Sequence, residues 1–355
     1  MAGDLTIPVI VFLVSAVSVI FFGIRLAVYG DALASLTGWG RLFVGSVLVA
    51  LATSLPELST NISAVRLDPP NPSLAVGNVM GANMLNMFNV SLVALIFGGK
   101  RFLQQVAPQQ GYLAALAVLL TGLAVLFGAI KMDISLWQVG LSSLILIVVF
   151  VVGMRVVYMT RPPVKEPTEE AEALGMTLKR AWVLFLFVCV GVVIAGFFLA
   201  WSTDRIAEIT GVASSTLGIL AVSLVTTIPE MSAAIAAARI GAADLGVAGL
   251  FGSNAFNVTI LFFADPFYRE GVLSSQAEPA HFIAGGMAVG LMLVGLALIL
   301  ARNRLKAPLV AAVLVLVMLA YIAGAVAVAT VGGAGEDTIQ GTASALIHSP
   351  QQPSQ

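Results

Sequence analysis

Two glutamates stand inside strongly apolar segments of the chain, and each directly follows a proline. Glu57 lies in the sequence ALATSLPEL (residues 50–58), and Glu230 lies in SLVTTIPEM (residues 223–231), 173 positions later. An ionised side chain at the centre of a membrane helix costs about 3 kcal/mol on insertion scales. An acid that occurs twice at matching positions therefore predicts a symmetric cation site.

The residues before each glutamate repeat with the spacing of one helix face. The first stripe, at i, i+3, i+4 and i+7, consists of Ala50, Thr53, Ser54 and Glu57. The second stripe, at the same spacing, consists of Ser223, Thr226, Thr227 and Glu230. Each helix thus presents hydroxyl groups and a carboxylate together.

Backbone oxygens are expected to join these side chains. Pro56 and Pro229 cannot donate a hydrogen bond to the carbonyls of Ala52 and Val225, four residues earlier. Hydroxyl, carbonyl and carboxylate oxygens are the ligands of hard ions such as Ca²⁺ and Na⁺, whereas Zn²⁺ and copper favour His and Cys. The single cysteine, Cys189, and the two histidines, His281 and His348, are distant from both stripes in sequence.

A second duplicated motif follows each acid. It reads GANMLN at residues 81–86 and GSNAFN at residues 252–257, so Asn86 and Asn257 correspond at an offset of 171. For all these polar residues the alternative is structural: neutral carboxyl groups and amides also hydrogen-bond helices together in membranes. This alternative has more weight for the two asparagines than for the glutamates.

The composition predicts an integral membrane protein. Hydrophobic residues make up 59% of the chain and charged residues 10%, with a mean hydropathy of +1.02. Because backbone groups in lipid must bond within their own segment, we expect an all-α fold. Ten segments are long enough to span a bilayer, near residues 6–27, 41–65, 73–97, 110–128, 134–154, 181–201, 213–238, 244–266, 281–301 and 307–331.

The spans divide into two repeats of five. We expect a first repeat at 1–154 with its motifs near 45–90, a linker at 155–180, a second repeat at 181–331 with its motifs near 218–261, and a disordered extracytoplasmic tail at 332–355. Asp31, Gly38 and Glu57 correspond to Asp204, Gly211 and Glu230. An odd number of spans per repeat inverts the second half and places both acids near the bilayer midplane.

Basic residues predict the orientation. Thirteen fall on one side: Arg25, Arg41, Lys100, Arg101, Arg155, Arg161, Lys165, Lys179, Arg180, Arg239, Arg302, Arg304 and Lys306. Four fall on the other: Arg66, Lys131, Arg205 and Arg269. The first side should be cytoplasmic, in a plasma or inner membrane, with both termini extracytoplasmic.

With these motifs the chain resembles the calcium/cation antiporter superfamily, on its sodium/calcium exchanger side. The resemblance implies exchange by alternating access, with Ca²⁺ held by Glu57, Glu230, Thr53 and Thr226. It implies Na⁺ binding by the same acids with Ser54, Ser223, Thr227, Ser253 and the Ala50 carbonyl, and a central polar position for Asn86 and Asn257. It implies no cofactor and no enzymatic activity; the expected partners are the bilayer and inorganic cations, not nucleic acid, and a monomer is expected.

Two residues depart from the family pattern. Ala82 stands where the family commonly has the serine that Ser253 retains, and Asn257 stands where sodium/calcium exchangers often have aspartate. The counter-ion and stoichiometry therefore stay open, and a proton-coupled or altered-selectivity divalent cation antiporter is the alternative within transport. A cation-binding membrane sensor that does not transport is the alternative from another class. The residue types do not distinguish among Ca²⁺, Mn²⁺ and Mg²⁺, because all three ions accept oxygen ligands.

Overall fold

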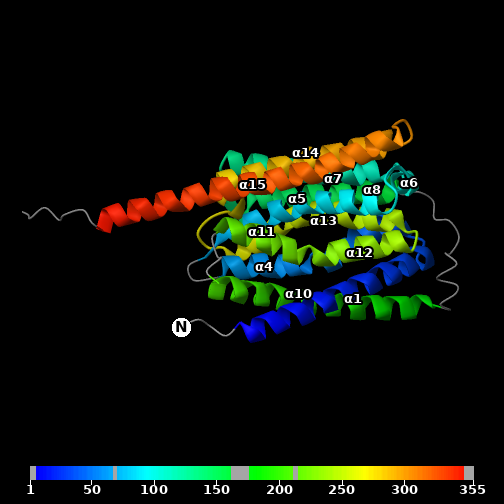
Figure 1. Ribbon diagram of the computed structural model, residues 1–355, viewed down its shortest axis with the longest axis horizontal. Coiled ribbons are helices and arrows are strands. Elements are labelled where there is room, and N and C mark those ends of the chain that lie inside the picture. Colours follow the sequence, from blue (N-terminus) through cyan, green and yellow to red (C-terminus); the bar gives the residue numbers. More distant parts are fainter. Residues whose placement is uncertain (1–4, 67–69, 161–175, 211–214, 348–355) are drawn as a thin grey trace, which may run out of the picture.

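The helices of the chain lie roughly side by side in a bundle (Figure 1). The structure is a computed structural model, and it describes residues 5–66, 70–160, 176–210 and 215–347. Its first half comprises α1 (Thr6–Leu36), α2 (Gly40–Phe43), the π-helix η1 (Val44–Val49), α3 (Ala50–Thr53), α4 (Leu55–Val65), α5 (Pro72–Ile96), α6 (Lys100–Gln105), α7 (Gln110–Ala129), β1 (Ser135–Leu136), β2 (Val139–Gly140) and α8 (Leu141–Thr160). Its second half comprises α10 (Leu178–Thr210), α11 (Ser215–Thr226), α12 (Ile228–Arg239), α13 (Ala243–Ala264), the 3₁₀ turns η2 (Asp265–Phe267) and η3 (Leu273–Gln276), α14 (Pro279–Ala301) and α15 (Ala307–Ile347).

The prediction of an all-helical membrane protein is confirmed, but the predicted number of ten spans is not. Within the described residues, eight helices are long and apolar enough to cross a membrane. A ninth span forms if Gly40–Thr53 and Leu55–Val65, which meet at 42°, count as one. The predicted segment 213–238 instead contains α11 and α12, each of 12 residues, separated at Thr227.

Local chemistry fixes where several helices begin. Asn71 caps α5, because its side-chain oxygen accepts a hydrogen bond from the Leu74 backbone N–H at 2.9 Å. Pro72 occupies the first turn of α5, where a missing N–H costs no helical hydrogen bond. Gly241 has a φ of +72°, which a residue without a side chain adopts easily in the turn between α12 and α13.

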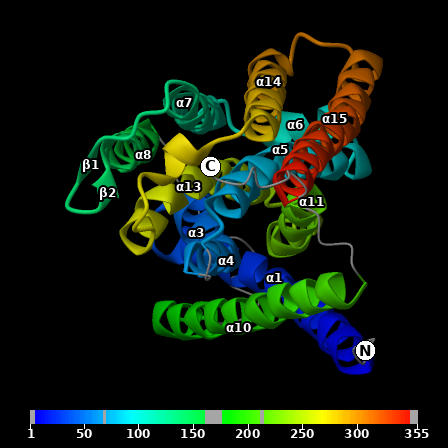
Figure 2. The same ribbon diagram turned by 90° about the vertical axis from the view of Figure 1, so that its left-hand side faces the viewer.

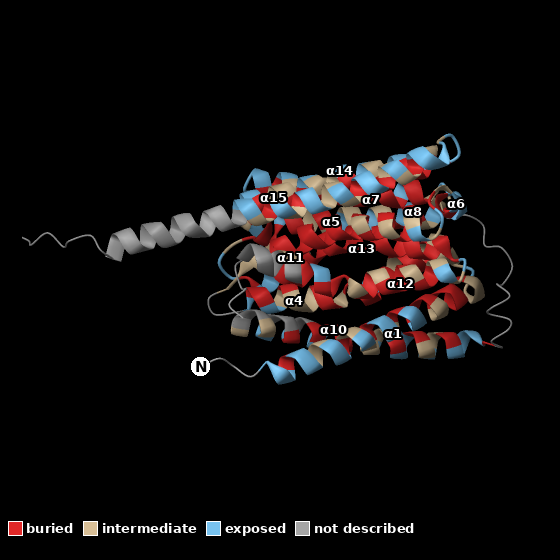
Figure 3. Cartoon of the chain, in the orientation of Figure 1, coloured by how far each residue is buried: buried red, intermediate tan, exposed pale blue. Residues whose placement is uncertain are grey.

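Helices α5 and α13 form the centre of the bundle. In their most apolar stretches 78% and 89% of the residues are buried, against 22% for α1 and for α15 (Figure 3). Helices α1 and α10 cross each other beside the rest of the bundle (Figure 2). The two asparagine motifs are therefore central, while apolar side chains of the outer helices face outward, as lipid requires.

Two sequence predictions need correction. The fifth span was expected from residue 134, but β1 and β2 form a short hairpin in which Ser135 pairs with Gly140, and α8 begins only at Leu141. The buried carboxylate of Asp265 holds this hairpin, accepting hydrogen bonds from the Gly140 and Leu273 backbone N–H groups at 2.9 Å each.

The second correction concerns the tail predicted to be disordered from residue 332. Helix α15 continues to Ile347, and no proline interrupts the sequence between Pro308 and Pro350. Residues 348–355, most of the predicted linker (161–175) and Gly211 lie outside the described residues.

We predict that Gly196→Ala destabilises the protein. A Cβ atom at Gly196 of α10 would lie 2.4 Å from Cγ of Pro56, a ring that cannot move aside without moving α4. Overpacking of this kind costs about 1–3 kcal/mol, so the melting temperature in detergent should fall. Gly290→Ala is the matched control, because nothing lies within 4 Å of a Cβ there. Equal melting temperatures for the two variants would contradict this packing.

Candidate cation-binding site

Both glutamates lie directly after a break in a helix. Ser54 separates α3 from α4 with φ −89° and ψ 6°, and Thr227 separates α11 from α12 with φ −86° and ψ 2°. Pro56 and Pro229 occupy the first turns of α4 and α12, where a missing N–H is tolerated. Glu57 and Glu230 thus fall in first turns, where free N–H groups and the helix dipole favour a negative charge.

The two carboxylates are buried and poorly satisfied. Glu57 is 0% exposed and Glu230 is 3% exposed. Within the described part of the chain, both oxygens of Glu57 and Oε2 of Glu230 have no hydrogen-bond partner, while Oε1 of Glu230 accepts a hydrogen bond from the Ser54 hydroxyl at 3.1 Å. Buried polar atoms without partners are rare in folded proteins, and clusters of them mark functional positions.

Each carboxylate faces hydroxyl groups of the opposite half. The Thr226 hydroxyl is close enough to Glu57 to stabilise its charged form, although the two do not form a hydrogen bond of regular geometry. Glu230 is within range of Thr53 and of Ser253, and the hydroxyls of those two residues are 3.4 Å apart. The two glutamates also interact with each other. Residues 173 positions apart in sequence therefore share one polar centre.

Four asparagines of α5 and α13 form a hydrogen-bonded network across the two helices. The Asn86 amide donates to Oδ1 of Asn254 at 3.0 Å, and the Asn257 amide donates to Oδ1 of Asn83 at 3.2 Å. Asn83 also donates to the Asn254 carbonyl at 3.0 Å. The side-chain oxygens of Asn86 and Asn257 have no partner among the described residues. Their amide groups are held by protein, and two acceptor oxygens remain available.

Several predicted ligands point elsewhere. The Thr227 hydroxyl donates to the Ser223 carbonyl of its own helix at 2.8 Å, and the Ser223 hydroxyl lies 3.3 Å from Oδ1 of Asn78. The Ala50 carbonyl already accepts hydrogen bonds from the Ser54 N–H at 3.0 Å and the Thr53 hydroxyl at 3.2 Å. These groups would need to exchange partners before binding a cation.

Sequence reasoning missed a buried polar chain beside the site. The Asn78 amide donates to Oδ1 of Asn61 at 2.9 Å, and the Ser223 hydroxyl contacts Asn78. Asn61 lies one helical turn after Glu57, a spacing that could have revealed it. In the second half, Ala234 corresponds to Asn61 and Gly249 to Asn78, and Ala50 of the first half corresponds to Ser223. The second half therefore lacks the two asparagines of this polar chain.

Comparison with solved structures identifies the same fold elsewhere. The sodium-calcium exchanger NCX_Mj soaked with Na⁺ and Ca²⁺ superposes with a TM-score of 0.66 over 89% of this chain and 97% of that one, at 17% sequence identity. The same protein soaked without Na⁺ and Ca²⁺ gives a TM-score of 0.62 over 89% and 96%, at 17% identity.

Comparison with known sequences identifies relatives among membrane proteins. The chain is 25% identical over 257 residues to the inner membrane protein YrbG of Escherichia coli, covering 70% of this chain and 76% of that protein. It is 26% identical over 274 residues to the putative antiporter CaxA of Alkalimonas amylolytica, covering 74% and 80%. The model of the family described as sodium/calcium exchanger protein matches twice, at residues 7–159 and 180–332. These two matches cover most of the chain, which therefore belongs to the sodium/calcium exchanger protein family of membrane antiporters.

Proposed function

We propose that this antiporter exchanges Na⁺ for Ca²⁺ by alternating access at a site built on Glu57 and Glu230. The observation that carries the proposal is the buried pair of carboxylates, three of whose oxygens have no hydrogen-bond partner within the described ranges. In the described part of the chain, no three His, Cys, Asp or Glu residues lie close enough to hold a metal ion together. Two ionised carboxylates balance one divalent cation, and neutral oxygens must complete its shell.

The surrounding oxygens allow a specific assignment. Thr53 and Thr226, each next to the acid of the other half, complete the proposed Ca²⁺ site with Glu57 and Glu230. Ser54 and Ser253 contribute to Na⁺ sites on the Glu230 side. Ser223, Thr227 and the Ala50 carbonyl join only after exchanging partners, and Asn86 and Asn257 supply central oxygens.

The proposed architecture is ten spans in two inverted repeats. Helix α1 approaches α12 at Gly23, where a Cβ would lie 2.8 Å from Cβ of Ser232. Gly196, at the corresponding position of α10, approaches Pro56 of α4 in the same way. These reciprocal contacts support a two-fold relation, and α11 with α12 then forms the tenth span, equivalent to α3 with α4. The basic residues orient it with both termini extracytoplasmic.

The proposed mechanism is competition for the two negative charges. Ca²⁺, or several Na⁺, neutralise Glu57 and Glu230, and the neutralised centre passes through a closed intermediate at low cost. With two bare carboxylates the same movement is costly. Exchange rather than leak follows, because the protein changes its facing state mainly with ions bound.

Exchange of protons for a divalent cation is the second candidate function. A difference between the two halves at the positions of Ser253 and Ala82 favours it. The Ser253 hydroxyl lies 3.4 Å from the Thr53 hydroxyl, whereas the residue that corresponds to Ser253 in the first half is Ala82, which has no hydroxyl. One proposed Na⁺ position thus has one fewer hydroxyl. A proton needs no such shell, so a site that has lost a hydroxyl favours protons over Na⁺.

We predict that Glu57→Gln and Glu230→Gln each abolish Na⁺-gradient-driven Ca²⁺ uptake. Either substitution removes one of the two charges that balance Ca²⁺, and the amide retains the shape of the side chain. The measurement is uptake of labelled Ca²⁺ by Na⁺-loaded proteoliposomes diluted into Na⁺-free buffer.

Glu270→Gln is the matched control for these variants, because Glu270 is exposed and outside the candidate site. It should transport at the wild-type rate. Uptake that persists in Glu57→Gln or Glu230→Gln would remove the carboxylates from the mechanism. Uptake by wild type that needs a pH gradient and ignores Na⁺ would establish proton coupling instead.

We predict that Ala82→Ser increases the apparent affinity for Na⁺. The added hydroxyl restores beside Thr226 the arrangement that Ser253 makes beside Thr53, and Ser253→Ala should have the opposite effect. We expect a change of several-fold in the Na⁺ concentration that half-inhibits Ca²⁺ uptake. Ala94→Ser, buried on the same helix but twelve residues farther along, is the control. Identical Na⁺ dependence of Ala82→Ser and Ala94→Ser would contradict a role for position 82.

A further inference from the structure

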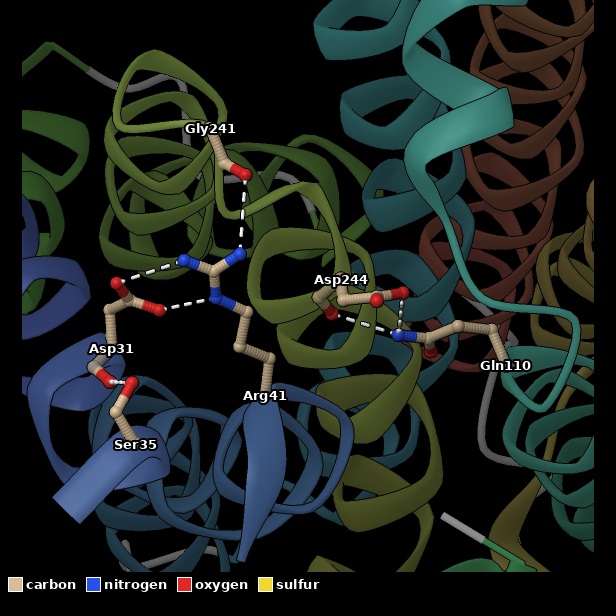
Figure 4. A network of polar contacts seen from close by, with 6 residues as sticks. All are labelled: Asp31, Ser35, Arg41, Gln110, Gly241 and Asp244. Atoms are coloured by element: carbon tan, nitrogen blue, oxygen red, sulfur yellow. Dashed lines mark hydrogen bonds and ion pairs between the residues drawn. The ribbon is translucent and has the colours of Figure 1, made fainter. Parts of the chain in front are cut away.

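An ion pair joins α1 to two other elements at the end of the bundle that carries Arg41, Lys100, Arg155, Arg239 and Arg302, here called the basic end. Nε and Nη2 of Arg41 donate to the two carboxylate oxygens of Asp31 at 2.5 and 3.1 Å, and Nη1 donates to the Gly241 carbonyl at 3.4 Å (Figure 4). Asp31 is only 2% exposed. One guanidinium therefore holds α1, α2 and the turn between α12 and α13.

This ion pair ties an outer helix to the centre. Helix α1 packs along α10, and these two lie beside the rest of the bundle (Figure 2). A Cβ at Gly30, the residue before Asp31, would lie 3.1 Å from Cγ2 of Val49 and 3.7 Å from Cδ2 of Leu245. The end of α1 is thus seated against η1 and α13, and Arg41 fixes it there. Bidentate Arg–carboxylate pairs are strong and geometrically specific.

The seated end of α1 covers a route to the site. A cavity of about 10 Å³ has Thr53 and Glu230 among its lining residues, as well as Ala237 and Leu245 nearer the basic end. Ala27 of α1 also lines it. A space of this size holds about one water molecule at most. The direct path from Glu230 to the Gly241 turn is therefore narrow while α1 is in place.

The two sides of the site differ. Toward the end that carries the β1–β2 hairpin, the buried chain of Asn61, Asn78 and Ser223 offers polar groups. Toward the basic end the corresponding residues are Ala234, Gly249 and Ala50, of which the first two line the narrow cavity. The residue that corresponds to Arg41 is Ser214, which carries no charge. The arginine of this ion pair therefore has no counterpart at the corresponding position of the second half.

We propose that Asp31 and Arg41 are positioning residues for transport: their ion pair latches α1 over the basic-end path, so the path opens only when the pair separates. The proposal rests on the alternating access proposed above and goes beyond it. Because the second half has Ser214 in place of this arginine, the latch biases the protein toward facing the hairpin end.

The test measures how fast a thiol placed in the narrow cavity reacts with a reagent applied from the basic end. In a Cys189→Ala background, Ala237→Cys places a thiol in the narrow cavity, and a charged, membrane-impermeant thiol reagent is applied to inside-out vesicles, which expose the basic end. We expect Asp31→Asn to accelerate labelling about tenfold, the population shift given by 1.4 kcal/mol. Asp31→Asn should be tolerated, because the Arg41 side chain is 30% exposed and keeps access to solvent.

Two further variants separate the latch from general damage. Asp31→Asn with Arg41→Gln leaves no uncompensated charge and should label as fast as Asp31→Asn alone. Gln110→Leu breaks a different tie at the same end, the 2.8 Å hydrogen bond from Gln110 to the Asp244 carbonyl, and should label at the wild-type rate. Wild-type labelling in a folded Asp31→Asn, or a return to the wild-type rate in the double variant, would overturn the latch. Labelling needs no ion gradient, so failure of Na⁺/Ca²⁺ exchange would leave this result standing.

Discussion

Two carboxylates buried in the interior of a membrane protein impose the constraint on which the rest of this structure depends. Neither Glu57 nor Glu230 is accessible, and three of their four oxygens have no donor among the residues that the structure describes. Such charges persist only where the protein or an ion compensates them. The helix breaks at Ser54 and Thr227 contribute by bringing the N-terminal turns of α4 and α12 to the acids. Prolines that would damage a continuous helix are tolerated at these breaks.

The same constraint explains why α5 and α13 are central and rich in asparagine. Neutral amides supply oxygens without adding charge, and their N–H₂ groups fix the geometry by bonding across the two helices. Helix α13 also approaches η1 closely, and Gly252 permits this: a Cβ there would lie 2.6 Å from the Ser46 backbone. Packing and site chemistry are therefore linked, since small residues bring the backbones together and polar side chains take the space that remains.

The sequence predicts the acids, their hydroxyl neighbours and most spans, because helical spacing and apolar length are local properties. It does not predict which acceptor a hydroxyl uses. The Thr227 hydroxyl donates to a backbone carbonyl of the preceding helix, whereas the Ser54 hydroxyl donates to the carboxylate of Glu230 in the other half. That choice depends on how distant helices meet. The hairpin at 135–140 was missed for the same reason, since Asp265, 125 residues beyond Gly140, holds it. Asn61 could have been predicted from its helical spacing to Glu57 alone, but its partner Asn78 could be identified only from the three-dimensional structure.

Under the alternating access proposed above, the departures from symmetry matter because a perfectly symmetric inverted repeat would have two facing states of equal energy. In that mechanism, each difference between corresponding residues, such as Asn61 against Ala234 or Arg41 against Ser214, would change one access path more than the other. A bias of 1.4 kcal/mol already makes one facing state tenfold more populated. In the proposed mechanism the carboxylates, retained in both halves, would set which ions neutralise the centre, and the residues that differ would set the side from which ions reach it. Selection can therefore adjust the resting direction of such an antiporter without altering a single ligand.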